Sequence, residues 1–184
     1  MKHLKTNISI LALLMAFSIT FTSCKDDDVI TPPDENEEEL ITSVELAFSE
    51  IGGDVSTFKF ADLDGDGGNG PTQFDTVRLK ANSEYLLGAR FLDESKTPAE
   101  NISIEVKEED DEHLVCYSVH GGTTVTITDK DENGLDLGLE AEVNTADAEM
   151  GHFTISLKHQ PDVKDGSCDV GETDVEVRFV LIVE

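Results

Sequence analysis

The feature that most constrains the fold is a two-residue alternation of apolar and polar positions. It is clearest at 135–143, where Leu135, Leu137, Leu139, Ala141 and Val143 alternate with acidic residues and a glycine. Successive side chains of a β-strand point to opposite faces of the sheet. The stretch is therefore typical of a strand with one buried face.

The same alternation recurs in short segments along the chain. We expect strands at 44–48, 56–60, 74–79, 85–92, 114–119, 123–128, 135–143, 153–157 and 175–183. Turn signals such as Gly52-Gly53 and Gly121-Gly122 separate them. The pattern predicts one all-β domain at 40–184, folded as an antiparallel immunoglobulin-like β-sandwich of about eight or nine strands.

The segment after residue 96 is ambiguous. Thr97-Pro98-Ala99-Glu100 has the form of a capping box, with proline at the first helical position. Ile102, Ile104 and Val106 nevertheless alternate as they would in a strand. Both structures remain open from sequence, and the alternation favours a strand.

The N-terminal residues 1–23 have the order of an export signal. Lys2 and Lys5 precede an apolar run at 8–21, and its length of about 14 residues suits a signal peptide better than a membrane-spanning helix. Thr22-Ser23 then precedes Cys24, as in the lipobox of bacterial lipoproteins. The sequence predicts lipid attachment at Cys24, and the alternative is an ordinary signal peptide with an incidental cysteine.

The residues after Cys24 suggest a destination. Lys25, Asp26, Asp27 and Asp28 resemble the signal that carries Bacteroidota lipoproteins to the outer face of the outer membrane. The alternative is that they begin a solvated tether. With either reading, the acidic stretch 24–39 is expected to be a flexible, self-repelling tether between the membrane anchor and the domain.

The chain is strongly acidic. Its formal net charge is −27, and loss of residues 1–23 would remove two lysines and no acids, which gives −29. A field of this sign repels nucleic acid, so no nucleic-acid partner is expected.

Two cysteines remain once Cys24 is assigned to lipid. Cys116 lies on an expected strand and Cys168 in an acidic loop. Thiols outside the cytoplasm can pair, but sequence does not show whether their Cα atoms are within bridging range. A Cys116–Cys168 disulfide and two free thiols both stay open.

A glycine- and aspartate-rich loop is the candidate metal site. Asp62, Asp64 and Asp66 alternate as in the opening of a calcium-binding loop, and Asp75 is a further candidate ligand. Gln73 stands where an EF-hand has its bidentate glutamate, so the loop is not an EF-hand. Calcium is thus a candidate cofactor, and a solvated turn is the alternative.

A second stretch, 129–140, satisfies the EF-hand pattern but has the chemistry of a hairpin. Asn133-Gly134 favours a tight turn, and the strand pattern that follows would carry Glu140 about 20 Å from that turn. We therefore predict a hairpin here.

The remaining candidate residues carry weak signals. His113, His120, His152 and His159 lack metal-ligand spacing and complete no nucleophile motif, so each is expected to be a surface or turn residue. Asp75-Thr76-Val77 resembles the short O-glycosylation sequon of Bacteroidota secreted proteins, which makes Thr76 a candidate; an ordinary strand residue is the alternative.

Several motifs together resemble a family of small uncharacterised Bacteroidota lipoproteins. They are the lipobox, 62–69, Leu92-Asp93-Glu94-Ser95, Asp111-Glu112-His113, 157–161 and 171–175. The resemblance covers most of the chain after Cys24. It implies a β-sandwich and a membrane address, but no established activity and no catalytic residues.

These observations lead to one expected function and two rivals. We expect a non-catalytic, outer-membrane, surface-exposed lipoprotein that acts as an interaction or structural module with an unknown protein or glycan partner. The first rival is a carbohydrate-binding accessory lipoprotein of an uptake system, which the absence of tryptophan disfavours. The second is an enzyme, for which the sequence offers no catalytic constellation.

Overall fold

The structure, a computed structural model, describes residues 40–65 and 68–184. In these residues the chain forms eleven strands and one short helix. They are β1 (Ser43–Glu50), β2 (Val55–Ala61), β3 (Gln73–Phe74), β4 (Val77–Leu79), β5 (Glu84–Asp93), β6 (Glu100–Asn101), α1 (Ser103–Glu108), β7 (His113–Val119), β8 (Thr124–Ile127), β9 (Glu140–Asn144), β10 (Glu149–His159) and β11 (Glu172–Val183). The all-β prediction is confirmed.

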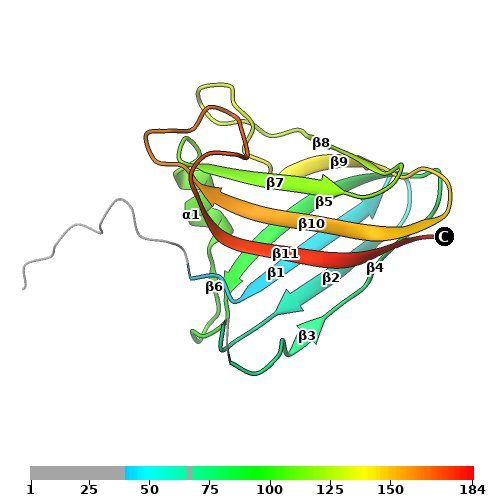
Figure 1. The fold of residues 1–184 in the computed structure, drawn as a ribbon, viewed down its shortest axis with the longest axis horizontal. Coiled ribbons are helices and arrows are strands. Elements are labelled where there is room, and N and C mark those ends of the chain that lie inside the picture. Colours follow the sequence, from blue (N-terminus) through cyan, green and yellow to red (C-terminus); the bar gives the residue numbers. More distant parts are fainter. Residues whose placement is uncertain (1–39, 66–67) are drawn as a thin grey trace, which may run out of the picture. The chain divides into compact units, whose positions relative to one another are not determined.

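The strands form two sheets that pack face to face (Figure 1). One sheet has the order β3-β2-β1-β5-β9-β8, with β6 also paired to β5, and the other has the order β4-β11-β10-β7. Neighbouring strands are antiparallel except β4 and β11, which are parallel. The sheet of β7, β10 and β11 lies in front in Figure 1, and the sheet of β1, β2 and β5 lies behind it.

The strand order is that of an immunoglobulin-like sandwich. The run β1-β5-β9-β8 corresponds to strands A, B, E and D, and β7-β10-β11 corresponds to C, F and G. Strands β2 and β3 are inserted before β4, which then joins the edge of β11. The eleven strands exceed the eight or nine expected because β3, β4 and β6 are separate pieces of two or three residues.

The core is built by the alternation seen in the sequence. On β1, Val44, Leu46 and Phe48 are fully buried. The Phe48 ring meets Tyr85 of its own sheet at 6.1 Å and Phe153 of the opposite sheet at 5.6 Å, both edge to face. Burial of a side chain of this size stabilises the fold by roughly 1.5–3 kcal/mol.

The expected strand at 74–79 is two strands in different sheets. Phe74 at its start belongs to β3 and pairs with β2, whereas β4 pairs with β11 on the opposite sheet. Asp75 and Thr76 form the crossing between them. Period-two alternation predicts strand conformation but carries no information about which sheet a strand joins.

The preference for a strand at 102–106 is wrong, because helix α1 begins at Ser103 and continues to Glu108. Ile102 and Val106 are 4% and 0% exposed, whereas Ile104 is 57% exposed. The buried pair therefore has the spacing i, i+4 of one helix face rather than the alternation of a strand. The Ser103 hydroxyl accepts a 2.7 Å hydrogen bond from the Phe91 N–H, which ties the helix to β5.

The expected strand at 135–143 is regular only in β9. Residues before it cross between the sheets: the Leu137 carbonyl accepts from the Val115 N–H of β7, and the Leu139 carbonyl accepts from the Ala89 N–H of β5. Gly138 makes this path feasible, because a Cβ there would lie 2.4 Å from the Val115 carbonyl oxygen.

The hairpin predicted within 129–140 is present only as a short turn. Lys130 and Asp136 form an antiparallel bridge. The Asp131 carboxylate accepts hydrogen bonds from the Asn133 and Leu135 N–H groups, and so closes the turn from inside. The Asp131 carboxylate of this turn is therefore hydrogen-bonded to backbone N–H groups.

Three connecting segments meet at one end of the sandwich (left in Figure 1). They are the turn 109–113 after α1, the loop 128–139 between β8 and β9, and the loop 160–171 between β10 and β11. We call these three segments the loop end.

Candidate functional site

The residues of the predicted membrane address lie outside the part of the chain that the structure describes. These are the lipidation candidate Cys24 and the export-signal candidates Lys25, Asp26, Asp27 and Asp28. Within the described ranges, no helix is long and apolar enough to cross a membrane.

The candidate calcium loop is held by hydrogen bonds of its own. The Asp64 carboxylate accepts from the Asn69 backbone N–H at 2.9 Å and from the Asn69 side-chain amide at 2.8 Å. These two bonds lower the pKa of Asp64. Asp66 lies outside the described residues, and Asp62 is half-buried at the end of β2.

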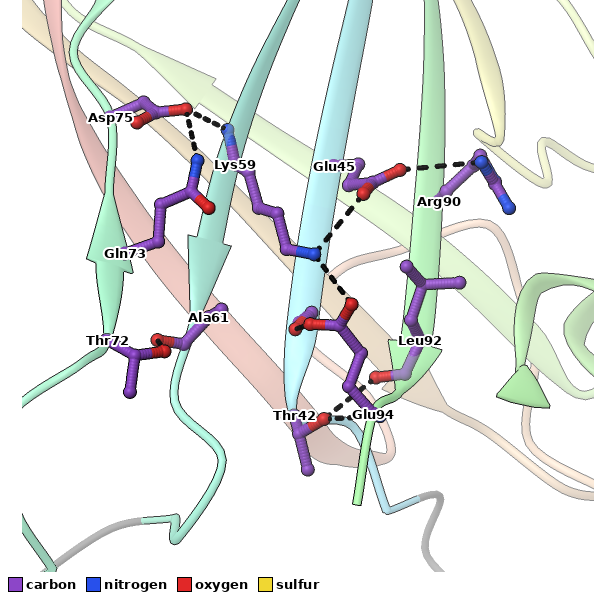
Figure 2. A network of polar contacts seen from close by, with 11 residues as sticks. Thr42, Glu45, Lys59, Ala61, Thr72, Gln73, Asp75, Arg90, Leu92 and Glu94 are labelled. Carbon is purple, nitrogen blue, oxygen red and sulfur yellow. Dashed lines mark hydrogen bonds and ion pairs between the residues drawn. The ribbon is translucent and has the colours of Figure 1, made fainter. Parts of the chain in front are cut away.

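Asp75, the fourth candidate ligand, is tied to β2 and β3. Its Oδ2 accepts from the Lys59 backbone N–H at 2.9 Å and from Gln73 Nε2 at 3.0 Å (Figure 2). Among residues 40–65 and 68–184, no three histidine, cysteine, aspartate or glutamate side chains are placed to hold a metal ion. A calcium site would therefore need Asp66 together with backbone carbonyls, and it stays a prediction.

The outer face of the larger sheet carries a self-contained charge network (Figure 2). Lys59 Nζ lies 2.7 Å from Glu94 Oε1 and 3.4 Å from Glu45 Oε1, and Arg90 approaches Glu45 at 3.4 Å from the other side. Burial opposes the charge of Lys59, but its hydrogen bond and attraction to Glu94, with help from Glu45, raise its pKa. On this face each base has a carboxylate partner.

In the structure, Cys116 of β7 and Cys168 of the loop 160–171 are joined by a disulfide, with Cα atoms 6.1 Å apart. The bond ties the loop to an edge strand. Gln160 fixes the same loop from within, because its Nε2 donates to the carbonyls of Ser167 and Val170.

A buried ion pair joins two segments of the loop end. Lys164 Nζ lies 2.8 Å from Asp131 Oδ2 and donates to the Asp110 carbonyl at 2.6 Å. Burial acts to raise the pKa of Asp131, but Lys164 and the N–H groups of Leu135 and Asn133 outweigh it and lower that pKa. One lysine therefore connects all three segments of the loop end.

The expectation of surface histidines is wrong for His113 and His159. They are register partners on β7 and β10, are 0% and 5% exposed, and stack with ring centroids 4.9 Å apart. His113 Nδ1–H donates to the Glu109 carbonyl at 3.1 Å, and its buried Nε2 has no hydrogen-bond partner among the described residues. Burial lowers the pKa of His113 to about 4, so the ring is neutral at pH 7.

A shallow groove of about 300 Å³ lies on the outer face of the smaller sheet. The odd-numbered residues of β10 fill the core, so its even-numbered residues face outward. The register places Arg178, Thr154 and Ser118 in one row across three strands, with His152 and His120 in the next row. All six lining side chains are polar: Ser118, His120, His152, Thr154, Glu176 and Arg178.

Arg178 differs from the other two arginines of the chain. Arg78 pairs with Glu184 at 3.5 Å and Arg90 pairs with Glu45 at 3.4 Å. Arg178 instead donates to the His152 ring at 3.1 Å and has no carboxylate partner among the residues that the structure describes. The groove thus contains a guanidinium that forms no ion pair with a described carboxylate, and no motif in the sequence indicates it.

Thr76, the glycosylation candidate, lies in the crossing between β3 and β4 and is half-buried. It is not part of a strand, and no bound group is present to test the sequon.

Comparison with known proteins adds no relative: no family model, no curated protein and no solved structure matches this chain. The resemblance to Bacteroidota lipoproteins therefore stays an expectation from the sequence.

Proposed function

We propose that this protein is a non-catalytic lipoprotein of the outer membrane, displayed at the cell surface, whose sandwich serves as an interaction or structural module. Cys24 carries the lipid, and Lys25 to Asp28 direct the protein outward. Two acyl chains on one cysteine, each with about 0.8 kcal/mol per buried methylene, attach such a protein stably.

The observation that carries the proposal is the Cys116–Cys168 disulfide at the loop end. Disulfides of this kind persist in oxidising compartments and are rare in the cytoplasm. The bond supports the export that residues 1–23 predict, through chemistry independent of the signal sequence.

The loop end supports a role in binding. In immunoglobulin-like domains the connecting loops commonly carry the binding function. Here a disulfide, the Lys164–Asp131 ion pair and the His113–His159 stack hold those loops in one arrangement. A surface that is already ordered loses less conformational entropy when a partner docks.

The contacts of the reactive side chains support the non-catalytic part of the proposal. Cys116 and Cys168 are bonded to each other, so neither can act as a thiolate nucleophile. His113 and His159 are buried and stack on each other, and in the described residues neither ring is hydrogen-bonded to a serine or threonine hydroxyl. These histidines contribute to packing.

Lipid attachment is tested by Cys24→Ala in the full-length chain. The variant is expected to accumulate as precursor or to appear in the soluble fraction, because it lacks the acylated residue. Cys168→Ala is the control, since it removes a different cysteine and should leave membrane partitioning intact. A Cys24→Ala protein that is processed and partitions into detergent like the parent would contradict the proposal.

Surface display is tested by replacing residues 25–28 with alanine. The variant should stay bound to the outer membrane but resist protease added to intact cells. The same protease should digest it once the cells are broken. Unchanged digestion in intact cells would remove the support for this export signal.

A second candidate function is a carbohydrate-binding accessory role in an outer-membrane uptake system. The polar groove on the outer face of β7, β10 and β11 favours it, because hydroxyl-rich ligands need both donors and acceptors. A neighbouring gene for an outer-membrane transporter would support this role.

A further inference from the structure

We propose that the groove across β7, β10 and β11 binds a saccharide that carries a carboxylate group, such as a uronic acid. The inference rests on the second candidate function above, and it names the ligand class. It starts from a contrast between the outer faces of the two sheets.

On the outer face of the larger sheet, the charged side chains already have partners and offer a ligand few free hydrogen-bonding groups. There Lys59, Glu45, Glu94 and Arg90 pair with one another. The hollow lined by Arg78 and Lys80 is similar, because those bases already pair with Glu184 and Glu50. Charged side chains that neutralise one another gain little from an added ion.

Most polar side chains of the groove on the smaller sheet are available to bind a ligand. Arg178 and His152 contact each other. The other four lining side chains make no hydrogen bond or ion pair with any described residue; they are Ser118, His120, Thr154 and Glu176. Donors and acceptors from three adjacent strands thus face outward without partners among residues 40–65 and 68–184. Their backbone positions are fixed by the register of the sheet.

Arg178 indicates that the ligand carries a negative charge. A guanidinium presents parallel N–H donors that fit both oxygens of a carboxylate, and such paired, charge-assisted bonds are about twice as strong as neutral ones. Lys158, farther along the same face of β10, also has no carboxylate partner in the described part of the chain and donates instead to the Thr173 hydroxyl. The chain as a whole is acidic, but exposed charges more than about 8 Å apart are largely screened at physiological salt, so distant acids do little to oppose an anion at this guanidinium.

Glu176 favours a sugar as the ligand over a simple anion or an acidic peptide. Its carboxylate only accepts hydrogen bonds, so it needs hydroxyl donors and repels a second acidic group. Val180, the register partner of His152, is 41% exposed and offers an apolar contact for the C–H groups of a sugar ring. One carboxylate beside several hydroxyls matches this combination.

The experiment is calorimetric titration of the full-length chain, purified in detergent, with glucuronate and galacturonate. Glucose, galactose and acetate are titrated in parallel at matched ionic strength. We expect the uronates to bind at least tenfold more tightly than the neutral sugars or acetate. Equal affinity for acetate and the uronates would overturn the saccharide assignment, and absence of uronate binding would overturn the proposal.

Variants assign the binding to the groove. Arg178→Ala should weaken uronate binding at least tenfold, and Arg178→Lys should weaken it less because it keeps the charge but loses the paired donors. Arg90→Ala is the matched control, because it removes the same charge from the outer face of the opposite sheet. Similar losses in Arg178→Ala and Arg90→Ala would overturn the proposal.

Glu176→Gln separates recognition of the sugar hydroxyls from recognition of the carboxylate. It should weaken uronate binding severalfold without weakening acetate binding, and an equal loss of affinity for both would contradict the role of Glu176. These titrations are independent of cellular location. If the uronates do not bind while the protein is found lipid-anchored at the surface, the groove inference fails and the proposed function stands.

Discussion

Lys164 Nζ lies 2.8 Å from Asp131 Oδ2, and the two side chains are 3% and 0% exposed. The pair connects the loop between β10 and β11 to the loop between β8 and β9. Because both charges have left water, each depends on the other for compensation.

Lys164→Met should therefore lower the free energy of unfolding by about 3–5 kcal/mol, since it leaves a buried carboxylate without its cation. Lys130→Ala is the control: it breaks an ion pair with Asp136 in which the side chains are 54% and 43% exposed. That exposed pair should be worth about 0–1 kcal/mol. The measurement is urea denaturation at pH 7, and equal losses in the two variants would contradict the buried-pair interpretation.

The His113–His159 stack should make the stability depend on pH. The pKa of His113 is lowered from 6.5 to about 4 in the folded state, so on acidification the unfolded chain takes up this proton first. The stabilisation is complete above about pH 6.5, is lost progressively as the pH falls toward 4, and amounts to about 3 kcal/mol.

His113→Gln removes this titration and keeps a donor toward the Glu109 carbonyl. Unfolding free energies of both proteins should be measured from pH 7.5 to pH 4, and their difference isolates His113 from the many carboxylates. The groups around the ring are His159, Lys164, Glu109, Glu112 and Asp111. A difference that does not change with pH would refute the assignment.

Gly138→Ala should be more destabilising than Gly134→Ala, although both glycines have positive φ. The φ values are +91° and +84°, so backbone strain is similar. A Cβ at Gly138 would lie 2.4 Å from the Val115 carbonyl oxygen, whereas a Cβ at Gly134 meets no atom within 4 Å. We expect about 1–2 kcal/mol for Gly134→Ala and about 3 kcal/mol or more for Gly138→Ala, measured by denaturation. Equal costs would show that the close approach to β7 is relieved by a shift of the loop.

Calcium should raise the melting temperature if the 62–70 loop is a calcium site. With a dissociation constant of roughly 10⁻⁴–10⁻³ M, typical of extracellular modules, a tenfold excess of calcium stabilises the fold by about 1.4 kcal/mol, or a few degrees. Magnesium at the same ionic strength should do less, because it requires tighter octahedral geometry.

The control for calcium is Asp64→Ala combined with Asp66→Ala. Loss of the hydrogen bonds to Asn69 will change the baseline stability, so only the shift caused by calcium is compared. Equal shifts with both metals, or a full calcium shift in the double variant, would rule out the site.

The strands could be predicted because alternation is a local property of the chain. Val44, Leu46 and Phe48 read as one buried face without knowledge of what covers them, and the structure buries all three. The turn within 129–140 could also be predicted, since Asn133-Gly134 favours one turn geometry. Local patterns failed where two structures share them: Ile102 and Val106 fit both an alternating strand and one face of a helix.

By itself, the sequence determined the class of fold and the acidic charge, and it predicted the limits of the domain and a membrane address. Each of these depends on residues close together in the chain. The tertiary structure decided which residues far apart in the chain lie together. They form the disulfide, the Lys164–Asp131 pair, the His113–His159 stack and the groove around Arg178. The physical reason is register, because the pairing of β7, β10 and β11 sets which side chains lie side by side, and a shift of one residue would turn Arg178 into the core and Phe179 out to solvent.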